Sequence, residues 1–339
     1  MSNKTIKLCS FVFLLPLFCF TQTLTGTVVD KTTQKPIETV AIYFDNTTLG
    51  TTTDSNGEFS ITYTDAVQST LVISYLGYEK IFISDYRLKT NMKIELIEAD
   101  NALDEVHIEY DDGLTRRQKL RLFKKEFLGV SKYGKSCKIL NEEDLVLKYD
   151  KKNKALYANS KVALKIENRA LNYEITYDLI DFEINFKYAN LNTVEFTVKS
   201  VFYYGTSFYR NLEDSDKPKT IKNRERVYNG SIQHFMRSLY NENLRDEDYF
   251  IFFDGFVVKE WSYFNVDAIV DSNLKKVTLK DKVSILYDKD FQSELQVDID
   301  EFYVDIYGNY SPIEGIYFSG SMGIQRVGDT LPLDYGISK

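Results

Sequence analysis

The two histidines of the chain are the first residues to examine for chemistry, because hydrolytic metal centres commonly use them. His107 begins the segment His-Ile-Glu, and His234 is followed by Phe-Met-Arg, which contains no acid. A catalytic zinc ion of the peptidase type takes a His-x-x-Glu pair and a distant second histidine, and it keeps one position open for water. Neither histidine has this spacing, so the sequence selects no metal ligand and predicts no zinc peptidase.

His234 could instead activate a nucleophile, since Ser231 lies three residues before it and Ser238 four residues after it. On a helix these positions share one face. A Ser–His pair also needs an acid that orients the imidazole and donors that stabilise the oxyanion. The sequence identifies neither, and we expect His234 to be a hydrogen-bonded histidine at an interface.

Acidic residues leave two further possibilities open. Asp54, Asn56 and Glu58 suggest a calcium loop, but the EF-hand pattern needs another ligand and a glycine at a different offset. We interpret the segment from Asp54 to Gly57 as a hairpin turn. A hydrolase that uses two carboxylates remains an alternative, although no motif selects a pair from the 50 acidic residues. The sequence therefore assigns no catalytic, cofactor-binding or metal-ligating residue.

Aromatic residues offer a different kind of site. Tyr203, Tyr204, Phe208 and Tyr209 flank the segment Gly-Thr-Ser. If these rings are exposed, they form a platform on which sugars can stack, and a glycan-binding module is the corresponding alternative function. We interpret them as alternating core residues of a strand.

A basic amphipathic helix is predicted from Thr115 to Leu128. Thr115 and Gln118 can form a capping box, and Gly129 can end the helix. The predicted apolar stripe is Leu120, Phe123, Phe127 and Leu128, and the opposite face carries Arg116, Arg117, Lys119, Arg121, Lys124 and Lys125. Such a helix can lie on an anionic membrane surface or bind an acidic partner; a core-packed helix with a solvated basic face is the simpler interpretation.

A second helix is predicted from Lys222 to Tyr240, with a buried stripe of Tyr228, Ile232, Phe235, Met236 and Leu239. Arg224 and Arg237 lie outside this stripe. Together with Arg226 they could bind a carboxylate or a phosphate, and salt bridges within an acidic protein are the simpler expectation.

The start of the chain predicts export. Lys4 and Lys7 precede an apolar run from Leu8 to Phe20, which is too short to cross a bilayer as a helix. We interpret residues 1–21 as a secretory signal peptide. Phe18 before Cys19 does not fit a lipid-attachment motif.

The remaining chain is acidic, since the 42 basic residues less Lys4 and Lys7 leave 40 against 50 acidic residues. A nucleic-acid partner needs a dense cationic surface, so this class is excluded. No later stretch resembles a transmembrane helix. Cys137 is the cysteine that remains after removal of the signal peptide, and although Lys135 and Lys138 could lower its pKa, a structural thiol is the simpler interpretation.

Short alternating runs bounded by turn residues predict a β-sandwich in the first part of the chain. The segments Leu24–Asp30, Gly50–Phe59, Leu71–Tyr78 and Ala102–Val106 carry a resemblance to the carboxypeptidase-regulatory-like domain. The resemblance implies a transthyretin-like β-sandwich of the kind found at the N-terminus of bacterial envelope and outer-membrane proteins. We place this domain at residues 22–106 and expect it to act as a contact module.

Residues 107–339 are predicted as a larger α+β domain, an antiparallel sheet with a few helices. Residues 223–239 and 307–335 are similar to segments of uncharacterised envelope proteins, a family that implies no activity. The sequence thus predicts a mainly β protein that is exported, periplasmic or associated with the outer membrane, and not an enzyme. Its expected role is binding or scaffolding of an envelope or outer-membrane protein, with a partner or ligand bound between the sheet and helices of the second domain.

Overall fold

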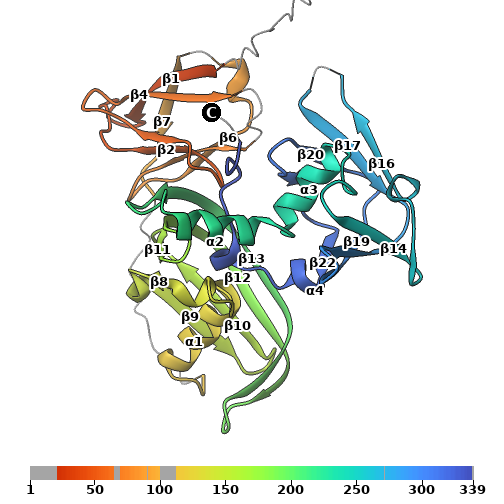
Figure 1. Cartoon of the computed structure of the whole chain (residues 1–339). Coiled ribbons are helices and arrows are strands. Elements are labelled where there is room, and N and C mark those ends of the chain that lie inside the picture. Colours follow the sequence, from red (N-terminus) through yellow and green to blue (C-terminus); the bar gives the residue numbers. More distant parts are fainter. Residues whose placement is uncertain (1–20, 65–68, 90, 100–111, 271, 338–339) are drawn as a thin grey trace, which may run out of the picture.

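The computed structural model describes residues 21–64, 69–89, 91–99, 112–270 and 272–337 (Figure 1). The chain is mainly β, as predicted, with four α-helices in the described part. Its buried apolar side chains form three clusters, one in the N-terminal sandwich and two in the region expected to be a single α+β domain. We refer to the units around these cores as the sandwich, the middle unit and the third unit.

Two sheets form the sandwich. The first has the order β4–β1–β7 and the second the order β3–β2–β5–β6. The strands are β1 (Thr21–Asp30), β2 (Ala41–Phe44), β3 (Gly50–Thr52), β4 (Glu58–Thr64), β5 (Leu71–Ser74), β6 (Ile81–Ile83) and β7 (Met92–Leu96). Strict alternation buries Phe59, Ile61 and Tyr63 between the sheets, because successive strand residues point to opposite faces.

The predicted hairpin turn before β4 is confirmed. The Gly57 N–H donates to the Asp54 carbonyl oxygen at 2.9 Å, and Gly57 has a φ of +73°. The Asp54 Oδ1 atom accepts the N–H groups of Asn56 and Glu58 at 2.9 Å each. This carboxylate therefore shapes the turn.

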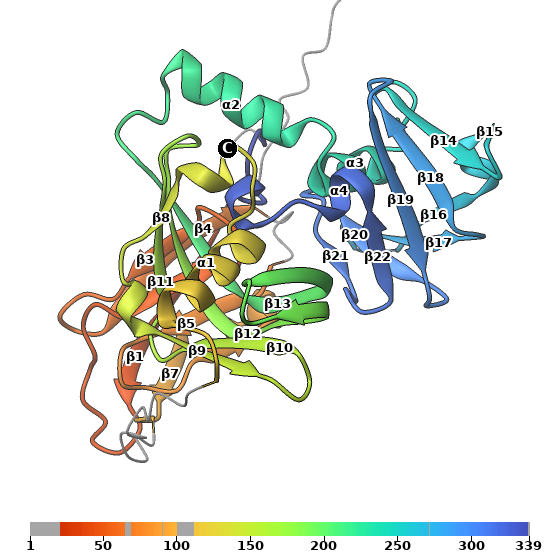
Figure 2. The same ribbon diagram turned by 90° about the horizontal axis from the view of Figure 1, so that it is seen from below.

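The middle unit is an antiparallel sheet of six strands with the helix α1 (Arg116–Phe127) packed on it (Figure 2). The strands are β8 (Cys137–Ile139), β9 (Leu145–Asp150), β10 (Ala155–Ser160), β11 (Leu164–Asn168), β12 (Tyr173–Asn190) and β13 (Glu195–Asn211). The capping box of Thr115 and Gln118 is confirmed. Lys119 was predicted on the solvated face; it is instead buried, and its Nζ atom lies 2.8 Å from Asp112 Oδ2.

The third unit packs α3 (Ile232–Tyr240) on two sheets, β15–β14–β18–β19–β22 and β16–β17–β20–β21. Its strands are β14 (Tyr249–Phe253), β15 (Phe256–Val257), β16 (Phe264–Ala268), β17 (Leu274–Leu279), β18 (Val283–Tyr287), β19 (Phe291–Val297), β20 (Phe302–Asp305), β21 (Tyr310–Ser311) and β22 (Ile316–Ser319), followed by the short helix α4 (Gly320–Gly323).

The single helix predicted from Lys222 to Tyr240 is wrong. The structure has two helices here, α2 (Pro218–Tyr228) and α3. Gly230 adopts a φ of +75°, and a Cβ atom on it would lie 2.7 Å from the Tyr287 ring. Ser231 caps the new helix, because its Oγ accepts the His234 N–H at 3.0 Å. A glycine in the left-handed region ends a helix. The apolar residues on both sides of Gly230 share one helical spacing, but the turn at Gly230 divides them between two helices.

The sandwich docks on the middle unit through the outer face of its second sheet. The Asn46 N–H donates to the Ser207 carbonyl oxygen at 2.7 Å, and the Tyr209 N–H donates to the Thr47 carbonyl oxygen at 3.0 Å. Lys80 forms an ion pair with the buried Asp178 of β12. One face of the predicted contact module is therefore occupied within the chain itself.

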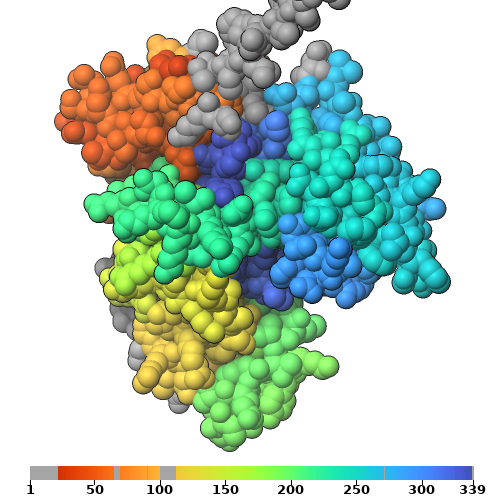
Figure 3. Space-filling model, viewed as in Figure 1, coloured from red at the N-terminus to blue at the C-terminus, as the bar shows by residue number. Residues whose placement is uncertain are grey.

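Residues 326–337, here called the C-terminal strap, connect the cores of the middle unit and the sandwich and are hydrogen-bonded to α3 of the third unit. Val327 and Leu331 belong to the core of the middle unit, and Leu333 belongs to the core of the sandwich. Figure 3 shows the C-terminal residues in dark blue between the orange sandwich and the green and cyan helices. The last residues of the strap thus act as internal packing material.

Arg237 of α3 holds this strap in place. Its Nε donates to the Tyr307 carbonyl oxygen at 3.0 Å, its Nη2 to that of Leu333 at 2.7 Å and its Nη1 to that of Tyr335 at 2.8 Å. Arg224 of α2 likewise donates to carbonyl oxygens of the middle unit. Both arginines are buried. The structure therefore corrects their prediction as anion ligands or as partners in salt bridges: their guanidinium groups donate to backbone carbonyl oxygens.

Replacement of Arg237 by lysine tests this role. An ammonium group cannot reach three diverging carbonyl oxygens as the planar guanidinium does, so we expect Arg237→Lys to lower the free energy of unfolding by about 2–4 kcal/mol. The measurement is urea denaturation followed by circular dichroism. The exposed Arg226 provides the control, and Arg226→Lys should change stability by less than about 0.5 kcal/mol. Equal effects of both substitutions would contradict the assignment.

Candidate binding cleft

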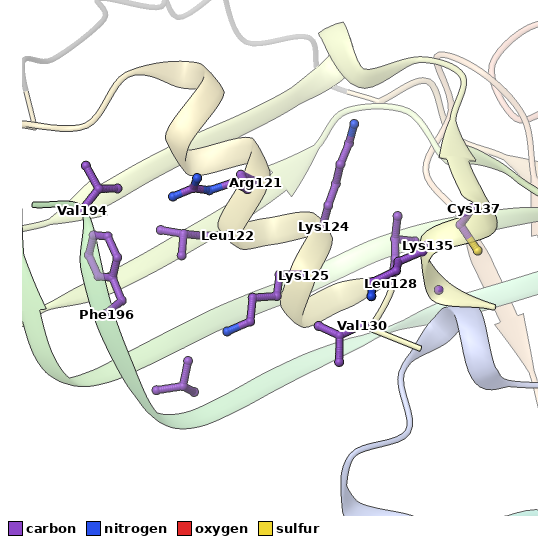
Figure 4. A pocket seen from close by; sticks show the side chains of 13 residues that line it. Arg121, Leu122, Lys124, Lys125, Leu128, Val130, Lys135, Cys137, Val194 and Phe196 are labelled. Carbon is purple, nitrogen blue, oxygen red and sulfur yellow. The ribbon is translucent and has the colours of Figure 1, made fainter. Parts of the chain in front are cut away.

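A cleft of about 490 Å³ lies between α1 and the far end of the β12–β13 hairpin (Figure 4). Its apolar lining comes from both sides. These side chains are Leu122, Leu128, Val130, Val194, Phe196 and Val198, and the cationic ones are Arg121, Lys124, Lys125 and Lys135. None of the described residues that line the cleft is acidic. The cleft therefore combines an apolar floor with a cationic rim.

The unusual length of two strands creates this cleft. β12 and β13 contain 18 and 17 residues, whereas the ladder of β11 with β12 ends at Tyr177 and that of β10 with β12 ends at Asn185. Beyond this point the two long strands pair with each other, and their register shifts around Phe186. Bulges of this kind bend a hairpin and increase its twist. The bent end brings Phe196 and Val198 to the side of α1.

The cations of the rim differ in how well they are paired. Lys124 forms an ion pair with Glu142, and Lys125 lies 3.1 Å from Glu126. Arg121 and Lys135 have no ion-pair partner among the described residues. In a chain with a formal net charge of −8, two such cations beside an apolar surface provide a site for an anionic group.

Cys137 borders the cleft, and its thiol donates to the Tyr133 carbonyl oxygen at 3.5 Å. Burial, with a smaller effect of the Asp329 charge, raises the pKa of this thiol to about 12. The neighbouring lysines therefore do not activate it. Cys137 is a structural thiol of the cleft wall.

His234 lies far from this cleft in a polar cluster of the third unit. Its Nδ1 atom accepts the Gly230 N–H at 3.1 Å, and its Nε2 atom lies 3.2 Å from Glu247 Oε2. Burial lowers the pKa of the imidazole. Ser231 and Ser238 bond to the backbone of residue 234 and not to its ring, so the structure does not form the Ser–His pair considered from the sequence.

The four aromatic residues considered as a sugar platform are separated by the fold. Tyr209 is buried, and the Phe208 ring lies 5.3 Å from the ring of Tyr43 in the sandwich. Tyr203 packs against the core of the middle unit. Tyr204 is exposed, and its exposed neighbour on the same face is Phe202, a residue that the sequence analysis did not select.

Two further observations concern metal ligands and membrane-spanning helices. They contain no group of three or more histidine, cysteine, aspartate and glutamate side chains that could hold a metal ion. None of the described helices combines the length and the apolar composition of a membrane span. Residues 1–20 of the predicted signal peptide and His107 lie outside the described residues.

The environment of Cys137 leads to a kinetic prediction. At pH 8 the folded protein should contain almost no Cys137 thiolate, so we expect alkylation by iodoacetamide to be roughly 100-fold slower than in the urea-unfolded chain. Peptide mapping by mass spectrometry measures the rate for this residue alone. Similar rates in both states would show that the thiol is open to solvent within the cleft.

Comparison with known proteins identifies the first unit. Residues 24–108 match the family described as the CarboxypepD_reg-like domain. A search of curated proteins finds no significant match to the chain. The matched residues include β1 from Leu24 onward and all of β2 to β7, the strands that build the sandwich. The N-terminal unit is therefore a CarboxypepD_reg-like domain, as the residue pattern of its strands predicts.

Proposed function

We propose that this protein is an exported, non-catalytic binding protein of the cell envelope, located in the periplasm or at the outer membrane. The pattern of residues 1–21 and the family of the sandwich support this location. The partner is an envelope or outer-membrane protein that inserts an acidic segment with an apolar side chain into the cleft beside α1. The sandwich acts as a scaffold that holds the curved middle sheet.

The composition of the cleft carries this proposal. Its floor contains Phe196 and Val198, and its rim contains Arg121 and Lys135, which form no ion pair with any described residue. An apolar anchor gains free energy from burial on such a floor, and a carboxylate beside it gains from the cations, which also steer an acidic partner to the site. The basic face of α1 thus borders a cleft and is not only a solvated surface.

The lining of the cleft supports binding without catalysis. A carboxylate hydrolase needs two acids that face the scissile bond, and the described lining residues include none. The raised pKa of Cys137 also disfavours a thiol nucleophile, because the thiolate is the reactive form. Binding is therefore the chemistry that these side chains support best.

Site-specific photo-crosslinking in intact cells tests the proposal. A photoreactive residue at Val130, which is 57% exposed in the cleft, should capture a single envelope protein. The same residue at Leu140, which is 46% exposed and outside the cleft, should not.

The charge requirement is tested in the same experiment with two double variants. Arg121→Glu with Lys135→Glu should reduce the crosslink from residue 130 at least about tenfold. Lys138→Glu with Lys161→Glu makes the same change in net charge at exposed positions outside the cleft and should leave the crosslink intact. A crosslink that survives the first pair of substitutions, or that forms equally from residue 140, would refute the cleft as the binding site.

A further inference from the structure

The opposite face of the middle sheet carries a row of side chains that the cleft does not use. In the strand registers, Phe202 of β13 stands opposite Glu183 of β12, Glu183 opposite Tyr157 of β10, and Tyr157 opposite Lys148 of β9. Residues paired in this way point to the same face. The four side chains therefore form a line across four strands, here called the aromatic row.

A third aromatic ring extends this row along β13. Tyr204 lies two residues after Phe202, which places the two side chains about 7 Å apart on one face, and it stands opposite Asp181. Phe202 is 51% exposed and Tyr204 47% exposed. Two large rings thus stand beside two carboxylates on an open surface.

Packing within the chain does not account for this exposure. The next residues on the same face of β13, Thr206 and Phe208, are covered by the sandwich: the Thr206 Oγ1 atom lies 3.3 Å from the Tyr43 hydroxyl, and Phe208 packs on the Tyr43 ring. The cover ends there, and the alternation continues with Tyr204 and Phe202 in the open. An exposed aromatic patch next to an internal interface indicates a surface for binding.

The hydrogen-bonding groups of the row indicate the chemistry of its ligand. Tyr157 lies opposite Glu183, and neither Glu183 nor Asp181 forms an ion pair among the described residues. These carboxylates accept hydrogen bonds, while Lys148 donates them. A sugar ring presents C–H groups on its face, which pack on aromatic rings, and hydroxyl groups at its edge, which both donate and accept.

We propose that the aromatic row binds a neutral polysaccharide, with Phe202 and Tyr204 as stacking platforms and with Asp181, Glu183 and Lys148 bonded to hydroxyl groups. Lys148 would repel a basic peptide at this surface. An apolar protein partner would bury the two carboxylates without hydrogen-bond partners, which costs free energy. The row lies on the face of the sheet opposite α1, so this site is independent of the cleft and of its proposed protein partner.

Affinity electrophoresis of the purified chain tests this site. Native gels containing galactomannan, xyloglucan, mixed-linkage β-glucan or pullulan serve as probes, and at least one polymer should retard the protein. Phe202→Ala with Tyr204→Ala should weaken that retardation at least about tenfold, since the variant lacks both aromatic rings on which a sugar could stack. Both residues are exposed, and circular dichroism checks that the variant remains folded.

Phe256→Ala with Tyr317→Ala removes two other exposed aromatic rings and should leave the retardation unchanged. The absence of retardation in all four polymers would overturn the proposal, as would equal losses in the two double variants. Binding of poly-L-lysine at the row in place of every polysaccharide would also overturn it, in favour of a basic peptide. The cleft variants Arg121→Glu and Lys135→Glu should retain polysaccharide binding, which separates this site from the proposed function.

Discussion

The buried guanidinium of Arg237 is the interaction on which the arrangement of the three units depends. It satisfies carbonyl oxygens of Tyr307, Leu333 and Tyr335, and two of these residues, Tyr307 and Leu333, complete the core of the sandwich. A buried carbonyl group without a hydrogen-bond partner costs free energy. The strap can therefore pack between the units only where hydrogen-bond donors face its carbonyl oxygens. One side chain of the third unit thus allows the C-terminal strap to pack into the first.

The strap also joins the sandwich to the middle unit. Leu333 donates its N–H to the Asn46 carbonyl oxygen at 2.7 Å, and Tyr209 bonds through its hydroxyl to Thr330 at 2.8 Å. Together with the backbone bonds around Ser207, these contacts fix the inner ends of β12 and β13. The far ends of β12 and β13 bend towards α1. The cleft forms because the inner ends of the two strands are fixed while their far ends are bent.

The two faces of the middle sheet differ in chemistry because different elements cover them. On one face α1 and the hairpin leave an apolar cleft with cations. On the other face the sandwich covers β13 only as far as Thr206, which leaves aromatic rings beside carboxylates. An acidic chain thereby presents two surfaces that differ in charge, and because of this difference we propose an acidic protein segment for one and a neutral glycan for the other.

The sequence by itself determined the local structure. Period-two alternation placed the strands of the sandwich, Asp54 and Gly57 determined a turn, and Thr115 with Gln118 determined the start of a helix, because each of these signals acts between residues close together in the chain. The burial of Lys119, Arg224 and Arg237 could not be predicted in this way. Their partners lie on other elements, and only the assembled fold shows which backbone acceptors or carboxylates need a buried cation.

The two candidate binding surfaces likewise could not be predicted from the sequence alone. The four aromatic residues near Gly205 form one pattern in the sequence, yet the sandwich covers Phe208, the core takes Tyr209, and Tyr204 stays exposed. The cations of α1 likewise border a cleft only because a hairpin more than 60 residues later bends towards them. The sequence determined the strands and the helix that carry these side chains; the docking of the sandwich, the strap and the hairpin decided which of them face solvent, because exposure depends on contacts between residues distant in the chain.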